Sequence, residues 1–269
     1  MSDKITLGAS EIKNLDDVQN SINDLNGKAG LYYYNLKDGS SYGINENERF
    51  IAASVIKIPV MIELFKECYD GKINMSDTLL INEKEKAPEE GAIAYMHDGT
   101  EVTLQDLCNL MIILSDNTAT NMLVNHIDID NINAAMEGLG IHTTRINRLL
   151  FDDAAEMEGK HNYISPKEIG TLLKIMYDGK LINKEASSKM LDILKLQQVN
   201  YKMPYLLPRD IKIAHKTGDD PGITHDMGIV FAKDPFIICF ASNETYVPKA
   251  DDFIRKVTKF FYEKANTNM

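Results

Sequence analysis

The sequence predicts an α/β (α+β) protein, in which an antiparallel five-stranded sheet is flanked by terminal helices and carries an inserted all-helical lobe. Short runs rich in Ile, Val, Tyr and Phe, bounded by turn residues, lie towards both ends of the chain. Between them, apolar residues recur almost throughout at helical intervals, and an amphipathic segment stands at each end. A sheet assembled from both chain ends around a helical insertion fits that order.

The two ends of the chain predict helices and a hairpin. Residues 9–25 and 253–261 carry apolar side chains at helical intervals. Residues 30–34 and 40–43, joined by Lys-Asp-Gly at 37–39, are typical of a β-hairpin.

Two helix starts in the middle of the chain are marked by capping residues. Thr103 followed by Asp106 is a variant of the capping box. Ser165 at the cap, Pro166 at the first helical position and Glu168 at the third form a fuller signal. We therefore expect helices to begin at both places.

The late strands complete the predicted organisation. Three short apolar runs predict strands, at 211–215, 227–232 and 236–241. We expect a sheet lobe made of 1–50 plus 205–269, a helical lobe of 51–204, and an active site in the cleft between them.

The composition excludes several classes of protein. With 44% hydrophobic and 26% charged residues among 269, the chain is long and apolar enough to bury a full core. A net charge of −11 disfavours nucleic acid as a partner, because such sites need clustered Lys and Arg. The apolar runs are short, so no membrane segment is predicted.

Cysteine and histidine usage predicts neither a metal nor another cofactor. Three cysteines form no metal-binding pattern, and six histidines show no paired ligand spacing. We expect a monomer with a small-molecule substrate. No charged-then-apolar leader opens the chain, which leaves a cytoplasmic protein and an exported one without its signal as alternatives.

Three short motifs carry the candidate chemistry. They are Ser-Val-Ile-Lys at 54–57, Ser-Asp-Asn at 115–117 and Lys-Thr-Gly at 216–218. The first pattern alone arises by chance, whereas the other two are much rarer and the three together indicate acyl transfer by a serine.

Elementary chemistry supports the first motif. Ser54 is predicted to begin a helix, where the N-terminal dipole favours developing negative charge. Lys57 lies three residues on, on the same helical face. A serine hydroxyl needs an adjacent base, and a lysine becomes one when burial or a second cation lowers its pKa. Lys216 is the candidate second cation.

On these motifs the chain resembles class A β-lactamases and related penicillin-recognising serine hydrolases. The likeness covers most of the chain, including residues 48–54, 103–107, 114–119, 145–148, 166, 215–218 and 224–226. The resemblance implies an acyl-enzyme on Ser54, with Lys57, Ser115 and Lys216 as the other catalytic groups. Ser115 would relay a proton to the leaving group.

The resemblance also implies a substrate-binding set. Asn117 would hold Lys57 and the substrate side chain, and Lys216 with Thr217 would bind the substrate carboxylate. Gly218 would let the substrate approach the backbone. The oxyanion hole would be the backbone N–H groups of Ser54 and Asp219.

The chain departs from the family in the loop after the helical lobe. Family members carry there a glutamate two residues beyond an arginine, and the residue two beyond Arg148 is Leu150. Asp152 and Asp153 are the nearest substitutes for a deacylating base. Asn162 stands where the family closes the loop with an aspartate, so we expect at best a neutral hydrogen bond to Arg148.

A second departure concerns charge. Asp219 and Asp220 follow the Lys-Thr-Gly motif, and we expect their carboxylates to cancel part of the Lys216 charge. No arginine lies in the strands after Gly222 to compensate.

The function predicted from the sequence is that of a β-lactamase-type serine hydrolase with slow deacylation. One alternative is a D-alanyl carboxypeptidase-like or esterase-like relative acting on D-alanyl peptides or small esters. Another is a penicillin-sensing or penicillin-binding domain that is acylated without turnover.

Overall fold

The fold is built around one five-stranded sheet. The computed structural model describes residues 11–88 and 91–267. Within these ranges the sheet has the order β2-β1-β9-β8-β7, and every neighbouring pair is antiparallel. Its strands are β1 (Lys28–Asn35), β2 (Ser41–Ile44), β7 (Ile213–Asp220), β8 (Ile223–Val230) and β9 (Phe236–Asn243). The antiparallel sheet predicted from both chain ends is confirmed.

The predicted hairpin is formed by β1 and β2. Tyr34 pairs with Ser41 at its closed end. The side-chain oxygen of Asn35 accepts hydrogen bonds from the backbone N–H groups of Lys37 and Asp38, which fixes the turn. Gly39 adopts the left-handed conformation, φ +78°, that lets the chain reverse.

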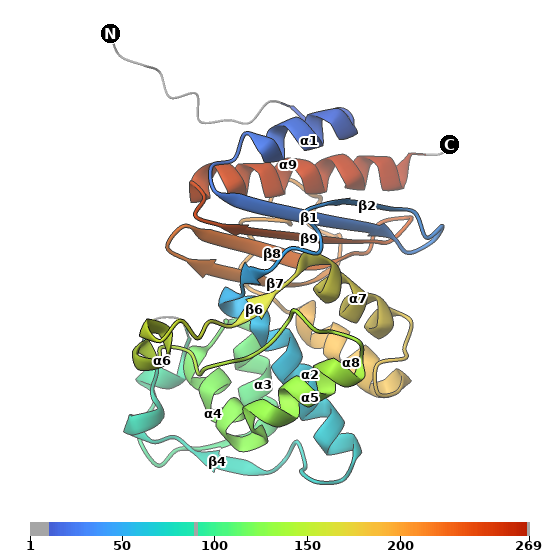
Figure 1. The fold of residues 1–269 in the computed structure, drawn as a ribbon. Coiled ribbons are helices and arrows are strands. Elements are labelled where there is room, and N and C mark those ends of the chain that lie inside the picture. The colour runs from blue at the N-terminus through green and yellow to red at the C-terminus, as the bar shows by residue number, and fades with distance from the viewer. Residues whose placement is uncertain (1–10, 89–90, 268–269) are drawn as a thin grey trace.

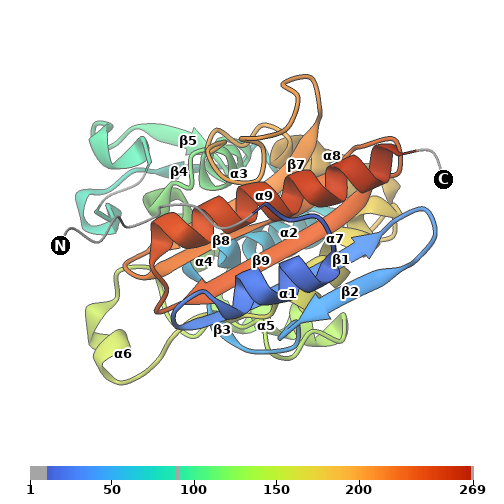
Figure 2. The same cartoon turned by 90° about the horizontal axis from the view of Figure 1, so that it is seen from above.

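Two terminal helices cover one face of the sheet, as Figures 1 and 2 show. They are α1 (Leu15–Asn23) and α9 (Val247–Asn266). Helix α1 begins later than the apolar spacing over 9–25 predicts, because Asn14 caps it and closes a capping box with Asp17. Ile12 lies ahead of the helix and is buried. Residues 9 and 10 lie outside the described residues.

The helices from the middle of the chain lie on the other side of the sheet (Figure 1). They are α2 (Lys57–Tyr69), α3 (Leu104–Ile113), α4 (Asn117–Ile127), α5 (Ile129–Gly138), α6 (Asp153–Met157), α7 (Pro166–Tyr177) and α8 (Lys184–Leu194). Of these, α7 and α8 pack against the strands. Short elements join them: β3 (Phe50–Ile51) with β6 (Tyr163–Ile164), β4 (Thr78–Leu80) with β5 (Glu101–Thr103), and the 3-10 turns η1 (Ala53–Ile56), η2 (Glu83–Glu85) and η3 (Ile93–Tyr95). The lobe boundaries at 50 and 205 stay a prediction.

Strand β9 shows why the sheet separates two cores. Alternate residues face opposite sides of a strand. Ile237, Cys239 and Ala241 belong to the core shared with the middle helices, whereas Phe236, Ile238 and Phe240 belong to the core under α1 and α9. A strand covered on both faces reads as a continuous apolar run, which is the pattern of residues 236–241.

The helix starts predicted at Thr103 and Ser165 are both confirmed. At the second one, Glu168 does not complete the capping box but binds another segment of the chain. Thr103 and Asp106 form the capping box of α3. Ser165 caps α7, but the Glu168 carboxylate turns away from the cap. It accepts hydrogen bonds from the backbone N–H groups of residues 142–144 at 2.7–2.9 Å. Glu168 thereby ties the chain that leads into the 148–162 loop to α7.

None of the helices in the two described ranges combines the length and the apolar character needed to cross a lipid bilayer.

Candidate active site

The first motif lies where the chain turns from β3 into α2. Ser54 sits in η1, which continues directly into the helix. Ala53 before it has φ +40°, a conformation that non-glycine residues rarely adopt. Lys57 is fully buried, and its Nζ lies 2.9 Å from Ser54 Oγ. The sequence spacing therefore places an amine directly on the hydroxyl.

The second motif joins this pair through two of its three residues. Lys57 Nζ lies 3.1 Å from Ser115 Oγ and 2.8 Å from Asn117 Oδ1. Ser115 also has a positive φ of 58°, which turns the chain between α3 and α4. Asp116 between them is structural: its carboxylate caps α4 through Ala119 N–H and holds the backbone of residues 92 and 93.

The third motif lies on the edge strand β7 and contacts the same group of side chains through Lys216. Lys216 is fully buried, and its Nζ donates to Ser115 Oγ at 3.0 Å and to Thr217 O at 2.9 Å. Thr217 is also buried. The Ser115 hydroxyl thus lies between two lysine amines. A continuous series of contacts runs from Ser54 through Lys57 and Ser115 to Lys216.

Gly218 allows β7 to pass close to the serine. A Cβ at this position would lie 3.2 Å from Ala53 Cβ and 3.3 Å from Ser54 N, and 3.0 Å from the His225 ring. A side chain here would push the strand away from the serine backbone. The absence of a side chain is what brings the two elements into contact.

An open cavity of about 530 Å³ lies in front of these groups. Its lining residues include Ser54, Asn117, Leu150, Asp153 and Asp219. The cavity is therefore bordered by η1, α4, the 148–162 loop and the end of β7. Across the residues that the structure describes, no three His, Cys, Asp or Glu side chains gather as a metal site would require.

Leu150 stands in the cavity wall with its backbone clamped. The amide side chain of Asn121 accepts from Leu150 N–H and donates to Leu150 O, both at 2.9 Å. The next residue, Phe151, has φ +59°, so the loop turns sharply there. The arrangement presents an aliphatic side chain, without any proton acceptor, to the cavity that contains Ser54.

The 148–162 loop is closed by an ion pair that was not predicted from the sequence. Arg148 was expected to make at best a neutral hydrogen bond with Asn162. The Arg148 guanidinium pairs with a different residue: its Nη2 lies 2.9 Å from Oε2 of Glu156, in α6. The Asn162 side chain makes neutral hydrogen bonds with the Arg148 backbone: its Oδ1 accepts from the N–H groups of Asn147 and Arg148, and its Nδ2 donates to Arg148 O.

The two candidate substitutes for the missing glutamate occupy different places. Asp152 caps α6, its carboxylate accepting from Ala155 N–H at 3.0 Å. Asp153 is exposed and lines the cavity. Asp153 is therefore the aspartate of the pair that faces the space in front of Ser54.

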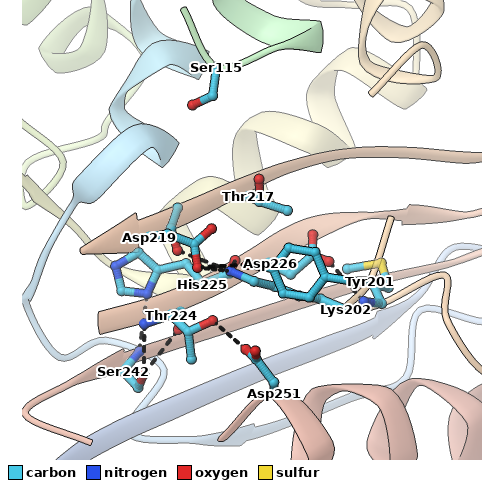
Figure 3. A network of polar contacts seen from close by, with 12 residues as sticks. Ser115, Tyr201, Lys202, Thr217, Asp219, Thr224, His225, Asp226, Ser242 and Asp251 are labelled. Carbon is cyan, nitrogen blue, oxygen red and sulfur yellow. Dashed lines mark hydrogen bonds and ion pairs between the residues drawn. The ribbon is translucent and has the colours of Figure 1, made fainter. Parts of the chain in front are cut away.

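Asp219 has a cationic partner that no motif revealed. Its Oδ1 lies 2.6 Å from Lys202 Nζ and accepts from the Tyr201 hydroxyl at 3.1 Å (Figure 3). The charge of Asp219 is thus neutralised by a residue other than Lys216. The sequence held only an indirect signal: two carboxylates directly follow Lys-Thr-Gly, and no arginine in the strands after Gly222 offsets their charge.

His225 connects the sheet to the segment before the serine. It is fully buried, and burial lowers its pKa from 6.5 to about 4. The neutral ring has a defined tautomer: Nε2 donates to Ile51 O at 2.8 Å, while Nδ1 accepts from Ser242 N–H at 3.1 Å (Figure 3). His215 lies behind the motif, with Nδ1 2.8 Å from Asp226 Oδ1. Both rings are buried, and their hydrogen bonds help to hold β7 and β8 in place.

Sequence comparison finds relatives among known β-lactamases. A relative described as a β-lactamase from Rhodobacter capsulatus is 26% identical over 175 residues, 64% of this chain and 59% of that protein. An imipenem-hydrolyzing β-lactamase from Enterobacter cloacae is 23% identical over 258 residues, 92% of this chain and 88% of the relative.

Solved structures give a longer match. The structure of PBP-A has a TM-score of 0.85 at 28% identity, covering 93% of this chain and 94% of that one. A leucine-to-glutamate variant of PBP-A has been solved as an acyl-enzyme complex with penicillin G. The profile of the Beta-lactamase enzyme family matches residues 13–265. With nearly its whole length matched, the chain belongs to the β-lactamase enzyme family.

Proposed function

We propose that the chain is a serine hydrolase of the class A type, which opens a β-lactam amide through an acyl-Ser54 intermediate and releases the acyl group slowly. The observation that supports this most is the contact series from Ser54 through Lys57 and Ser115 to Lys216 at the edge of one cavity. These are the residue types that attack by a serine requires: a hydroxyl, an adjacent amine base and a proton relay.

Acylation follows from these contacts. Lys57 acts as the base in its neutral form: its amine takes the proton of the Ser54 hydroxyl as Oγ attacks the lactam carbonyl carbon. The backbone N–H groups of Ser54 and Asp219 stabilise the oxyanion, which typically accelerates such a step by about 100- to 1,000-fold per donor. When the C–N bond breaks, the Ser115 hydroxyl gives its proton to the nitrogen and regains one from the Lys57 ammonium.

The remaining motif residues fit substrate binding. Lys216 and Thr217 lie beside the serine on β7 and would hold the substrate carboxylate. The Asn117 amide lines the cavity and would contact the acyl side chain. Gly218 keeps the strand close enough for its backbone to meet the substrate.

Deacylation lacks an evident base. Leu150 lines the cavity and cannot take a proton from water, and Asp153 is the candidate that faces the cavity in its place. General-base catalysis typically contributes about 100- to 10,000-fold to such a step, so its loss leaves a persistent acyl-enzyme. The PBP-A acyl-enzyme with penicillin G supports acylation by penicillins on this fold.

Leu150 also favours a second candidate function. A chain that is acylated and does not turn over would act as a penicillin-binding domain. A D-alanyl carboxypeptidase-like or esterase-like relative would use the same Ser54 and Lys57 on a D-alanyl peptide or a small ester. The rates of acylation and release separate the three.

Intact-mass spectrometry after brief mixing with penicillin G tests the proposal. We expect the chain to gain the mass of one penicillin and to keep it over many minutes. Ser54→Ala should gain nothing, and Ser76→Ala, which removes an exposed hydroxyl far from the motifs in the chain, should behave as wild type. An unmodified wild-type chain, or an adduct retained by Ser54→Ala, would contradict the proposal.

A further inference from the structure

A lysine outside the three motifs is fully buried beside the cavity. Lys202 has no exposed surface, although it carries a charge. Its Nζ donates to Asp219 Oδ1 at 2.6 Å, to His225 O at 3.1 Å and to Gly218 O at 3.2 Å. An ammonium has three N–H donors, and these three acceptors satisfy all of them. A charge this buried persists only when it is paired in this way.

The chain around Lys202 is held on both sides. Met203 N–H donates to Asp226 Oδ2 at 2.9 Å, and Arg255 Nε donates to Tyr201 O at 2.6 Å. The Tyr201 hydroxyl returns to the same carboxylate oxygen of Asp219 that Lys202 binds (Figure 3). Hydrogen bonds to the residues on either side of Lys202 therefore fix its backbone. The fixed backbone helps to keep the side chain directed at the end of β7.

The contacts of Lys202 fall on one point of the sheet. Gly218 and His225 are directly opposed in the β7–β8 ladder, and the ammonium binds the carbonyl groups of both. Gly218 is also the residue that packs against the Ser54 backbone. Lys202 thus fixes the part of β7 that meets the serine.

The same contact offsets the charge of one of the two carboxylates that follow the Lys-Thr-Gly motif. Asp219 lines the cavity, and its side chain is 28% exposed. A free carboxylate there would repel the carboxylate of a substrate held by Lys216 and Thr217. With Lys202 2.6 Å away, the pair presents no net charge to the cavity.

We propose that Lys202 is a positioning residue that sets substrate specificity: it neutralises Asp219 and holds the Gly218–Asp219 end of β7, so that anionic substrates are admitted. The proposal rests on the function proposed above. Under that function, the Lys202–Asp219 pair lets a cavity edged by Asp219 admit a substrate with a free carboxylate.

A double-mutant cycle on Lys202 and Asp219 tests the proposal. The proteins are wild type, Lys202→Met, Asp219→Asn and the double variant, with Lys189→Met as a control that removes an exposed lysine of α8. Acylation rates are measured with three penicillins that share one nucleus: ampicillin with an amine in its side chain, penicillin G with a neutral one, and carbenicillin with an extra carboxylate.

We expect Lys202→Met to slow acylation by penicillin G about 10- to 100-fold, the range that an uncompensated charge nearby produces. The loss should be largest for carbenicillin and smallest for ampicillin. The double variant should return to the rate of Asp219→Asn, because the unpaired carboxylate is gone. Lys189→Met should match wild type.

Three results would overturn the proposal. One is an unchanged rate in Lys202→Met. Another is an equal loss for all three penicillins, which indicates a packing role. The third is a double variant as slow as Lys202→Met.

Failure of the proposed function would look different. In that case no penicillin would acylate the wild-type chain. Urea unfolding of wild type, the two single variants and the double variant would then test whether Lys202 positions the end of β7 through Asp219. Lys202→Met should lower the unfolding midpoint, and adding Asp219→Asn should recover part of the loss. No recovery would show that the two residues are not coupled.

Discussion

At the scale of single residues, Leu150 and Ser54 line one cavity. Under the proposed function, the fate of the acyl-enzyme depends on the side chain that the loop presents there. The Leu150 backbone is held by both ends of the Asn121 amide. A replacement side chain at this position would therefore start from the same place and point towards the same space. Under the proposed function, a base at this position could serve deacylation, and leucine supplies none.

Replacing Leu150 with glutamate should speed release of the acyl group. We expect Leu150→Glu to raise the deacylation rate after penicillin G by about 100-fold or more, because a carboxylate there can take a proton from water. Leu150→Gln is the matched control, with the same shape and no base, and should leave the adduct long-lived. The decay of the adduct mass with time measures both. Equal decay in the two variants would show that the position does not serve deacylation.

At the scale of elements, the packing of α7 under the sheet depends on one glycine. A Cβ at Gly170 would lie 2.5 Å from the Tyr32 ring of β1. Alanine in a helix is favoured over glycine by about 0.5–1 kcal/mol. Overpacking a tight contact costs about 1–3 kcal/mol. The clash therefore outweighs the helix propensity.

Gly170→Ala should destabilise the chain by about 1–2 kcal/mol in urea unfolding. Gly138→Ala in α5 is the matched control, because a Cβ there would meet no atom within 4 Å. It should be neutral or stabilise the chain by up to about 1 kcal/mol. The same sign for both substitutions would mean that α7 does not pack on Tyr32 as described.

At the scale of the whole molecule, His225 links β8 to β9 and to the β3 segment that leads to Ser54. Its pKa is lowered from 6.5 to about 4 by burial, so the folded chain binds fewer protons than the unfolded chain between these values. The contribution of His225 to stability should therefore be constant above pH 6.5 and should become less favourable as the pH drops towards 4. Burial raises the pKa of Asp251, which acts in the opposite direction.

The difference between variants isolates this histidine. Urea unfolding of wild type should lose more stability between pH 7 and 4.5 than His225→Gln loses, by roughly 2–3 kcal/mol. His126→Gln, at an exposed position of α4, is the control and should follow wild type. Parallel curves for wild type and His225→Gln would contradict a neutral, buried ring in the folded chain.

Local patterns determined much of this protein. The hairpin around Gly39, the caps at Thr103 and Ser165, and the apolar run of β9 are set by residues a few positions apart, where turn chemistry, capping and side-chain period act directly. The three motifs likewise name the groups that meet at Ser54. Strand β7 was placed too early, at 211–215, because its polar motif residues are buried and read poorly as a strand.

The tertiary structure decided which distant charges meet. Lys202 faces Asp219, and Glu156 closes the loop on Arg148, although no local pattern connects either pair. Such contacts depend on the register of β7 on β8 and on the path of the 148–162 loop. A periodic sequence pattern shows which face of an element is buried. Which charged groups come within 3 Å of one another is decided only when the elements pack.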